Sequence, residues 1–541
     1  MPIEALRSYA ASGRRDTLLL ILAGTLLFLP GLGSRDLWNP DEPRYAEVAR
    51  EMLLTGEYLV PHLNGDLYTQ KPPLQFWAMA ASARLTGKLD EAAARLPAVL
   101  SAIAALVLVH KLGARLFGRR AGWLAAAAFA TCSKVLWQGR IGQIDMLLVA
   151  LVAAAVWFWL RSWTENRPWL VLGFYFFAGL GTLAKGPVSL LPPLFGILVF
   201  LLWERDRDGL RRLWLGRGLL VYAGVALLWL VPAALHAGTD YLRAIAFRQT
   251  VERYAEPWHH FQPWYYYLET LPADFFPWSL LAPGAIYAAW STLHGQARRG
   301  LRFALAWCIA TLVFFSVSPA KRTVYILTMY PGLAIAVGAG LDVVSSTWPR
   351  FRRWLVWPLA ALAIVLAAGA ALVPHQTARR AAELAPLGPG LTPQLVALLL
   401  LMAIAAAAAA IFARRGRVSE AVSVLALGLG TATLAAVLWI LPRFDVLKSA
   451  RPLSQEILAR IGPGEPYAIF PRIDASFLFY TGKFCQLPQG EAELRAYAAR
   501  PDRVWLVIKK DELSKLDPPL PMVEVARDAD AEEGFALLAK P

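Results

Sequence analysis

The sequence predicts a polytopic α-helical membrane protein with about 13 transmembrane helices, a long first external loop and a small C-terminal soluble α/β domain. Hydrophobic residues make up 57% of the 541 residues and only 17% are charged, whereas soluble proteins carry about a quarter charged residues. Several runs, including 17–32, 146–163, 218–235 and 395–412, approach the roughly 20 apolar residues that cross a bilayer as a helix. Arginine clusters between these runs recur at alternate loops, which predicts an orientation.

The arginine clusters include 115–120, 205–217, 298–302 and 350–353. Short loops rich in Lys and Arg stay in the cytoplasm, so the net charge of +15 is interpreted as a topology signal, and nucleic acid is not an expected partner. The N-terminus is predicted to be cytoplasmic. Because the number of predicted spans is odd, the tail from Pro442 is predicted to lie outside.

Two domains are predicted: a transmembrane domain, residues 1–441, and an external α/β domain, residues 442–541. The spans are expected at 17–33, 96–116, 121–138, 144–163, 168–184, 187–203, 218–236, 271–290, 303–318, 323–343, 354–373, 394–413 and 420–441. The Pro/Gly break at 185–187 leaves a re-entrant turn open as an alternative for the short pair around it. The N-terminal apolar run lacks a small-residue cleavage site and is interpreted as a retained first span.

The first external segment, residues 34–95, is too long to be a simple connector. Residues 39–43 read Asn-Pro-Asp-Glu-Pro, which is typical of the start of a helix. The apolar residues that follow at helical spacing are Tyr45, Val48, Ala49, Met52 and Leu53. Since Glu47 and Glu51 fall off that face, this helix is predicted to lie in the membrane interface. A second helix is predicted after Lys71-Pro72-Pro73.

The second long external segment, residues 237–270, is rich in Trp and Tyr, which suits the headgroup level of a membrane. In the tail, 504–508 is predicted to form a buried strand and 491–499 a helix. The three cysteines have no metal-ligand spacing.

Charged residues gather on the predicted outer face, where a Lys or Arg at the end of a span is unfavourable unless it serves a site. They are Asp41, Glu42, Arg44, Lys71, Arg140, Asp145, Lys185, Arg253, His260, Lys321 and Arg322. Basic groups beside an apolar groove suit a ligand with a phosphate head and a long apolar tail. Carboxylates on the same face suit a general base or an acceptor-positioning group.

Structural interpretations of the same residues stay open at this point. Asp41 and Glu42 would also stabilise a helix N-terminus. Asp145 would also cap the helix it begins, and Lys71 alone is compatible with a surface lysine beside a Pro-Pro turn.

Several motifs together resemble a known family. They are Asp41-Glu42-Pro43-Arg44-Tyr45-Ala46-Glu47, Gly65-Asp66-Leu67-Tyr68, Lys71-Pro72-Pro73, Arg140-Ile141-Gly142-Gln143-Ile144-Asp145, Leu183-Ala184-Lys185-Gly186-Pro187, Pro263-Trp264-Tyr265-Tyr266-Tyr267 and Ser318-Pro319-Ala320-Lys321-Arg322. The set resembles the phospholipid-carrier-dependent glycosyltransferases of the GT-C superfamily, which include protein O-mannosyltransferases and the bacterial lipid A aminoarabinose transferases. The resemblance covers the region 35–345.

This resemblance implies a donor in which a sugar is attached to polyisoprenyl (undecaprenyl) phosphate, and an acceptor such as lipid A, another glycan or glycolipid, or a protein. It also implies a multi-pass protein of the bacterial inner membrane with a periplasmic active site. Asp41, with Glu42 beside it, would be the catalytic or acceptor-positioning carboxylate and Asp145 a second acid. The residues implied to bind the donor phosphate or support its cavity are Lys71, Arg253, Lys185, Lys321, Arg322, Arg44 and Tyr45.

One position departs from the family pattern. In the aminoarabinose transferases a glutamate precedes the phosphate-binding lysine and binds a metal together with a later histidine. Here Gln70 stands in place of the glutamate, whereas His260 matches the histidine. Because a neutral amide is a poorer divalent-cation ligand than a carboxylate, a bound metal is not an expected cofactor.

Two other function classes are compatible with a polytopic membrane protein. A transporter or flippase of a lipid-linked sugar would show internal repeats and ionisable residues near the membrane midplane. The sequence shows no clear repeat, and its charges concentrate on one face. A lipid-binding scaffold is disfavoured by the acid and base residues of the first external loop.

Overall fold

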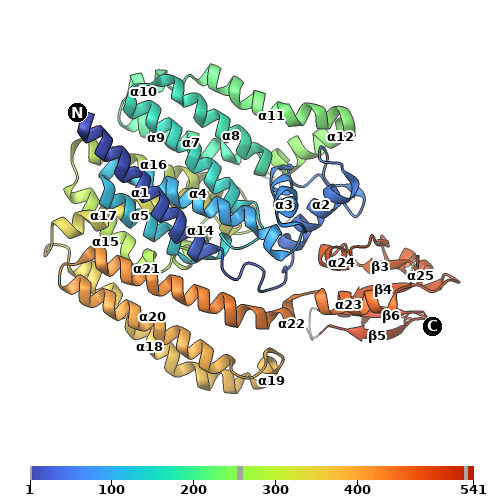
Figure 1. Ribbon diagram of the computed structural model, residues 1–541. Coiled ribbons are helices and arrows are strands. Elements are labelled where there is room, and N and C mark those ends of the chain that lie inside the picture. Colours follow the sequence, from blue (N-terminus) through green and yellow to red (C-terminus); the bar gives the residue numbers. More distant parts are fainter. Residues whose placement is uncertain (1–2, 253–259, 463, 529–533, 541) are drawn as a thin grey trace.

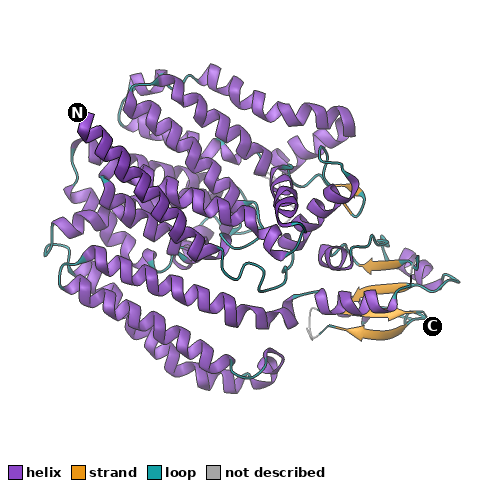
Figure 2. Cartoon of the chain, in the orientation of Figure 1, coloured by secondary structure: helices purple, strands orange, loops and turns teal. Residues whose placement is uncertain are grey.

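The computed structural model describes residues 3–252, 260–462, 464–528 and 534–540, and it shows a bundle of long helices with a small sheet domain at the C-terminal end (Figures 1 and 2). Nine helical segments of the described chain are long and apolar enough to span a membrane. They are 91–117 (α4, Glu91–Phe117), 145–165 (α7, Asp145–Glu165), 168–185 (containing α8, Val171–Lys185), 207–237 (containing α11, Leu215–Ala237), 295–317 (α16, Gly295–Val317), 323–346 (containing α17, Tyr330–Ser346), 353–379 (α18, Arg353–Arg379), 391–414 (α20, Leu391–Arg414) and 418–448 (containing α21, Val418–Ala435). The protein is therefore a multi-pass membrane protein, as predicted.

The remaining predicted spans coincide with shorter or more polar helices. These are α1 (Ile3–Phe28), α5 (Arg119–Thr131) with α6 (Ser133–Gln138), α9 (Leu191–Trp203), and α14 (Tyr266–Asp274) with α15 (Trp278–Thr292). Every predicted span thus overlaps a helix. The number of helices that cross the membrane stays a prediction.

Small residues let the helices of the bundle approach closely. An added Cβ at Gly340 of α17 would lie 2.0 Å from the backbone oxygen of Ala285 in α15. At Gly338 it would lie 2.6 Å from the backbone nitrogen of Ala125 in α5. Side chains larger than hydrogen would separate these helices, as is typical of helix contacts in membranes. The close packing holds α17 in the centre of the bundle and fixes the segment that precedes it.

The helix predicted after residues 39–43 forms as α2 (Asp41–Thr55), and α3 (Leu74–Thr86) follows the Lys-Pro-Pro turn. The polar face of α2 is covered within the protein, because α2 packs against α3 and against α24 (Ala475–Thr481). The position of this helix in the membrane interface stays a prediction. Glu47 and Glu51 are 0% and 1% exposed. Arg50 donates to Glu47 at 2.7 Å, and Glu51 accepts from backbone amides of the following turn, including that of Gly65 at 3.0 Å. These bonds satisfy the buried carboxylates.

The C-terminal domain contains a four-stranded sheet in the order β3-β4-β6-β5. The strands are β3 (Tyr467–Phe470), β4 (Trp505–Lys509), β5 (Val523–Arg527) and β6 (Phe535–Ala539), and the flanking helices are α23 (Arg451–Arg460), α24 and α25 (Glu491–Ala499). β3 and β4 are parallel, whereas β6 pairs antiparallel with β4 and β5. The predicted helix 491–499 and the apolar strand near 504–508 are both present.

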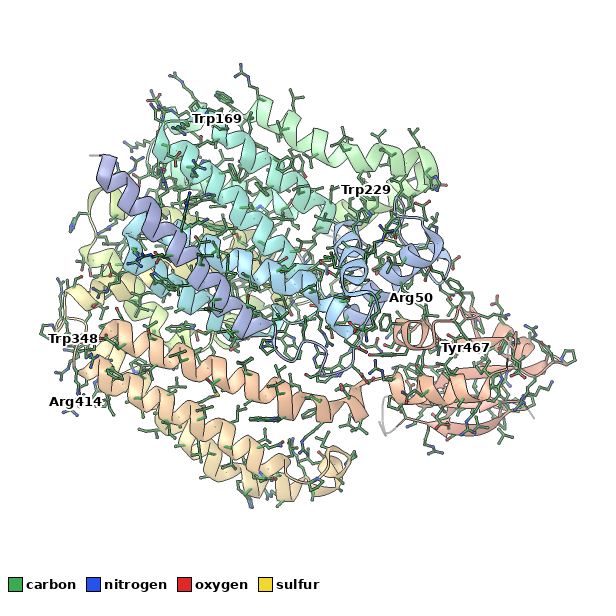
Figure 3. The ribbon with its side chains drawn as sticks, in the orientation of Figure 1. Arg50, Trp169, Trp229, Trp348, Arg414 and Tyr467 are labelled. Carbon is green, nitrogen blue, oxygen red and sulfur yellow. The ribbon has the colours of Figure 1, made fainter. Side chains whose placement is uncertain are left out.

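The sheet domain contacts the segment 34–95 through specific hydrogen bonds. The Asn39 side chain donates to Asp474 at 2.8 Å and accepts from Ser476 at 2.7 Å. The backbone amide of Leu37 donates to the hydroxyl of Tyr480 at 2.7 Å. Figure 3 shows the C-terminal domain, with Tyr467 labelled, beside the part of α2 that carries Arg50. The segment before α2 and the C-terminal domain therefore pack together around α2.

Candidate active site

Asp41 is the first residue of α2, and three elements of the bundle converge on its carboxylate. Arg322, between α16 and α17, lies 3.1 Å from Oδ2. Gln143, in the turn before α7, donates to the same oxygen at 3.2 Å. Arg44, one turn along α2, lies 3.7 Å from Oδ1. The side chain of Asp41 is 9% exposed, so this carboxylate is held in a defined position by charged and amide donors.

Asp145 forms the second carboxylate of this region. It begins α7 and makes an ion pair with Lys185, the last residue of α8. The Lys185 ammonium also lies 5.0 Å from the centre of the Tyr325 ring. Burial lowers the pKa of Arg322, but Asp41 and Asp145 together raise it above its ordinary value. Arg322 therefore interacts electrostatically with both carboxylates. Asp41, Arg322, Asp145 and Lys185 form one charged cluster.

Glu42 points away from this cluster into a second, fully satisfied network. Arg95 of α4 donates to it at 2.7 and 3.1 Å, Arg35 donates at 2.9 Å, and the amide of Gly142 donates at 2.9 Å. Burial raises the pKa of Glu42, but Arg95 and Arg35 outweigh this effect and lower the pKa to about 2. The geometry favours an anchoring role for Glu42 over the predicted catalytic one.

A cavity of about 200 Å³ lies next to the charged cluster. Its polar lining includes Lys71, which precedes α3, Lys185, and the side chains of Thr182 and Tyr222. Its apolar wall comes mainly from α11 and the segment after it: Ala226, Trp229, Leu230, Ile245 and Ala246. Two ammonium groups beside an apolar wall suit a phosphate attached to a hydrocarbon chain.

Tyr45 and Lys321 lie elsewhere than at this cavity. The Tyr45 ring is buried against Phe76, with ring centres 5.7 Å apart. Burial and the nearby Asp41 hold the pKa of its phenol well above the ordinary value. The ammonium of Lys321, a residue that is 3% exposed, donates to backbone carbonyls, at 2.6 Å to Ser318 and at 3.0 Å to Gln262. In this structure Lys321 joins the loops that carry Gln262 and Ser318, which departs from its predicted role in the cavity.

Gln70 and His260, the two positions considered for a metal, lie in different surroundings. Gln70 lines the 200 Å³ cavity. His260 has an exposed side chain, and its backbone oxygen accepts from the amide of Lys321 at 3.0 Å. Arg253 lies outside the described residues. Within the described chain no three His, Cys, Asp or Glu side chains converge on one point, and the neutral amide of Gln70 is a weak ligand for a divalent cation. No step of the chemistry below is assigned to a metal.

Three residues that sequence reasoning did not select belong to the site region. Gln143 lies in a motif that was noted, but a glutamine gives no charge signal. Arg95 was interpreted only as the end of the first loop, although it is a buried arginine at the beginning of a span. Tyr325 lies in an apolar run and carries no polar pattern around it. Their roles depend on contacts with residues 53, 102 and 140 positions away, which spacing along the chain does not reveal.

Comparison with known proteins identifies relatives of this chain. Residues 70–236 match the family of dolichyl-phosphate-mannose-protein mannosyltransferases. The chain is 33% identical over 332 residues to an undecaprenyl phosphate-alpha-4-amino-4-deoxy-L-arabinose arabinosyl transferase of Erwinia tasmaniensis, covering 59% of this chain and 58% of the relative. It is 32% identical over 370 residues to a second such transferase of Pseudomonas fluorescens, covering 67% and 62%. The match thus spans about 60% of the length of these relatives.

Solved structures share the fold over almost the whole chain. A crystal structure of ArnT from Cupriavidus metallidurans bound to undecaprenyl phosphate has a TM-score of 0.80 at 24% identity, covering 97% of this chain and 98% of that one. The archaeal oligosaccharyltransferase AglB from Archaeoglobus fulgidus, in complex with an inhibitory peptide and a dolichol-phosphate, has a TM-score of 0.53 at 13% identity, covering 93% and 70%. The helical bundle with its C-terminal domain is therefore an ArnT-like fold.

Proposed function

Because this chain contains a domain of the dolichyl-phosphate-mannose-protein mannosyltransferase family within an ArnT-like fold, we propose that it is a glycosyltransferase. It transfers a sugar from a polyisoprenyl (undecaprenyl) phosphate donor to an acceptor outside the cytoplasm. The observation that carries this proposal is the cluster of Asp41, Arg322, Asp145 and Lys185 beside a cavity that also contains Lys71.

The donor is proposed to occupy the 200 Å³ cavity with its phosphate at Lys71 and Lys185. Its isoprenoid chain would leave along the apolar wall of α11. In the transfer step the bond between the anomeric carbon and the phosphate oxygen breaks, and a bond from the acceptor oxygen to that carbon forms. Negative charge develops on the departing lipid phosphate. Fixed ammonium groups at that position stabilise it, which is the electrostatic form of catalysis.

Asp41 is proposed to act on the acceptor. If the acceptor is a hydroxyl, its proton moves to the Asp41 carboxylate as the new bond forms. If the acceptor is a phosphate, it is already ionised, and Asp41 with Arg322 only positions it. The relatives named as aminoarabinose transferases support a lipid A type acceptor. A glycan, another glycolipid or a protein is the alternative, since Gln70 departs from the pattern of those transferases.

The proposed location is the bacterial inner membrane, with the N-terminus in the cytoplasm and the site and C-terminal domain in the periplasm. The alternating arginine clusters support this orientation. In this orientation the loops with Asp41, Lys71 and Arg322 would lie on the side opposite the basic loops. Transfer then takes place at the periplasmic face of the inner membrane, to which the head of the donor lipid has already been translocated.

The test is sugar transfer by purified protein from a labelled undecaprenyl phosphate donor. Asp41→Asn is expected to lower kcat by roughly 10²-fold or more because it removes the acceptor-facing carboxylate. Lys71→Ala is expected to raise the donor KM because it removes one of the phosphate-binding ammonium groups. Both variants should insert into the membrane and elute as monodisperse protein.

Asp208→Asn and Lys515→Ala are matched controls, since these side chains are 76% and 63% exposed and lie outside the site. They should behave as the unsubstituted protein does. Robust transfer by both Asp41→Asn and Lys71→Ala would refute the site. Mass spectrometry of lipid A and envelope glycans from deletion and complemented strains would identify the sugar and acceptor. A strain pair with unchanged glycans but altered sidedness of the lipid-linked sugar would replace the transferase with a flippase.

A further inference from the structure

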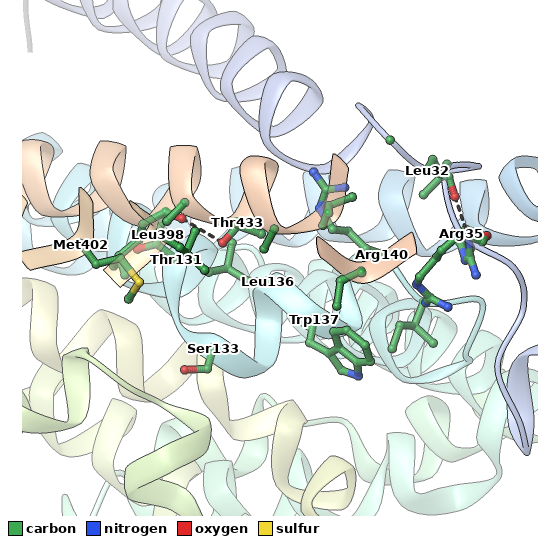
Figure 4. Close-up of a pocket in the computed structure, with 18 of the residues that line it drawn as sticks. Leu32, Arg35, Thr131, Ser133, Leu136, Trp137, Arg140, Leu398, Met402 and Thr433 are labelled. Atoms are coloured by element: carbon green, nitrogen blue, oxygen red, sulfur yellow. Dashed lines mark hydrogen bonds between the residues drawn. The ribbon is translucent and has the colours of Figure 1, made fainter. Parts of the chain in front are cut away.

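A larger cavity, of about 320 Å³, lies on another side of the same loops. It is bounded by the end of α1, by α5 and α6, and by α20 and α21 with the segment that follows α21 (Figure 4). Arg35 and Arg140 are at one end of it, whereas Leu398 and Met402 are at the other. Its volume is within the range of ligand sites.

The walls of this cavity are apolar. Leu136, Leu429 and Val437 are typical of the lining. The hydroxyl groups of the lining donate to backbone carbonyls of the protein. Ser133 donates to the carbonyl of Phe276 at 2.9 Å, and Thr433 donates to that of Leu429 at 2.8 Å. The body of the cavity therefore favours a hydrocarbon chain over a polar molecule.

The polar end has a single sign of charge. All three charged residues that line the cavity are arginines: Arg35, Arg95 and Arg140. Arg35 and Arg95 share the carboxylate of Glu42. Arg35 also lies over the indoles of Trp38 and Trp137, at 4.5 and 5.6 Å, so its guanidinium is held in place at the cavity wall.

Arg140 is the residue that points to a ligand. It is 7% exposed, and it has no ion pair among the described residues. Its terminal nitrogens donate to the carbonyls of Leu27 and Pro30 at the end of α1. Its Nε is buried and has no hydrogen-bond partner in the described structure. Carbonyl groups stabilise the guanidinium but do not neutralise it, and a buried donor left without a partner is unfavourable.

This cavity is separate from the proposed donor site. The turn 139–144 contributes Arg140 and Ile141 to the larger cavity, whereas its Gln143 donates to Asp41 of the charged cluster. The two cavities share no lining residue. The carboxylate cluster also does not line the larger cavity, so the larger cavity has no role in the chemistry proposed above.

We propose that the larger cavity is a second lipid site, which binds an anionic phospholipid of the membrane. The phosphate lies against Arg140 and Arg35, and one acyl chain lies between α20–α21 and α5–α6. The charge of the arginine end selects the phosphate, whereas the apolar walls select the chain. Binding there supports the turn that carries Gln143, and it does not depend on the identity of the donor or acceptor.

The experiment is native mass spectrometry of the purified full-length protein titrated with phosphatidylglycerol and, separately, with diacylglycerol. These probes share acyl chains and differ in the phosphate. Phosphatidylglycerol should bind and diacylglycerol should not. Arg140→Gln should weaken phosphatidylglycerol binding by about tenfold or more, since a charge-assisted hydrogen bond is lost. Thr433→Phe, which fills the apolar part and leaves the arginines, should weaken it as well.

Two matched variants assign the bound lipid to a cavity. Arg380→Gln changes an exposed arginine after α18 and should keep full binding. Lys71→Ala changes the proposed donor cavity and should also keep it. Equal binding of diacylglycerol, or unchanged binding to both Arg140→Gln and Thr433→Phe, would overturn the proposal. So would loss of binding in Lys71→Ala alone, because the lipid would then be in the donor cavity. All of these readouts are independent of sugar transfer.

Discussion

Replacing Glu42 by glutamine separates an anchoring carboxylate from a catalytic one. The carboxylate is 2% exposed and accepts from Arg95, Arg35 and the amide of Gly142. A glutamine keeps one acceptor oxygen, but its NH₂ group faces donors. Removal of one partner from a buried ion pair costs about 3–5 kcal/mol, so Glu42→Gln is expected to destabilise the folded protein by about that amount at neutral pH.

The pKa of Glu42 gives an independent magnitude. Its ordinary value is 4.5 and its value in the folded protein is about 2, a difference that corresponds to about 3 kcal/mol. Because the folded-state pKa is the lower one, this stabilisation is fully present above pH 4.5 and is lost as the pH falls toward 2. Glu42→Gln lacks the titrating group, so the stability difference between the two proteins should shrink over this window.

The assay is thermal unfolding in detergent, followed by size-exclusion chromatography, at neutral pH and at steps down to about pH 3. Glu456→Gln is the matched control. Its exposed i,i+4 pair with Arg460 should contribute less than about 0.5 kcal/mol. A Glu42→Gln protein that is as stable as the original but inactive would refute the reasoning and restore Glu42 as a catalytic carboxylate. A stability difference that stays constant with pH would refute it as well.

Three further substitutions test the site and its support. Arg322→Gln removes the ion pair to Asp41 and should lower kcat for sugar transfer by roughly 10²-fold, with little change in the donor KM; an unchanged kcat would contradict the cluster. Lys185→Gln leaves Asp145 without its ion-pair partner and removes a proposed phosphate-binding group. A titration with the donor, followed by native mass spectrometry, should therefore show weaker donor binding, whereas wild-type affinity would exclude Lys185 from the donor site. Tyr480→Phe removes the hydroxyl that binds an amide of the first loop, and limited proteolysis should then cleave that loop faster; equal cleavage rates would show that this bond does not hold the domain.

The helices of this protein could be predicted from sequence because their signals are local. A run of apolar residues has to span lipid as a helix, since lipid offers the backbone no hydrogen-bond partners and a helix satisfies them internally. The helix over 491–499 follows from its own residues. The burial of α2 could not be predicted in this way. Glu47 and Glu51 are normally solvent-exposed residue types, and the turn amides and Arg50 that satisfy them become visible only in the folded chain.

The site shows the same limit at adjacent positions. Asp41 and Glu42 follow each other in one motif, and either could be selected as the acceptor-facing acid. Their roles differ because the helix turns them to different partners, Asp41 to Arg322 and Glu42 to Arg95. Lys321 and Arg322 are likewise adjacent bases, but among the described residues only Arg322 reaches a carboxylate, whereas Lys321 donates to backbone carbonyls. Composition and motif predict which segments carry the charged residues of the site. The direction in which each side chain points depends on tertiary packing.

The contact between the segment 34–95 and the C-terminal domain has a consequence for biogenesis. Segments fold from the N-terminus as the chain is synthesised, so the loop with Asp41 leaves the ribosome long before α24 exists. The hydrogen bonds of this segment form only after the C-terminal domain has been made. They join Asn39 to Asp474, Leu37 to Tyr480 and Asn64 to Cys485, and the last pair is 421 residues apart. A chain that stalls or is truncated before this domain has made all of its spans but lacks the wall that positions α2. The site is therefore assembled only in chains that have been synthesised to full length.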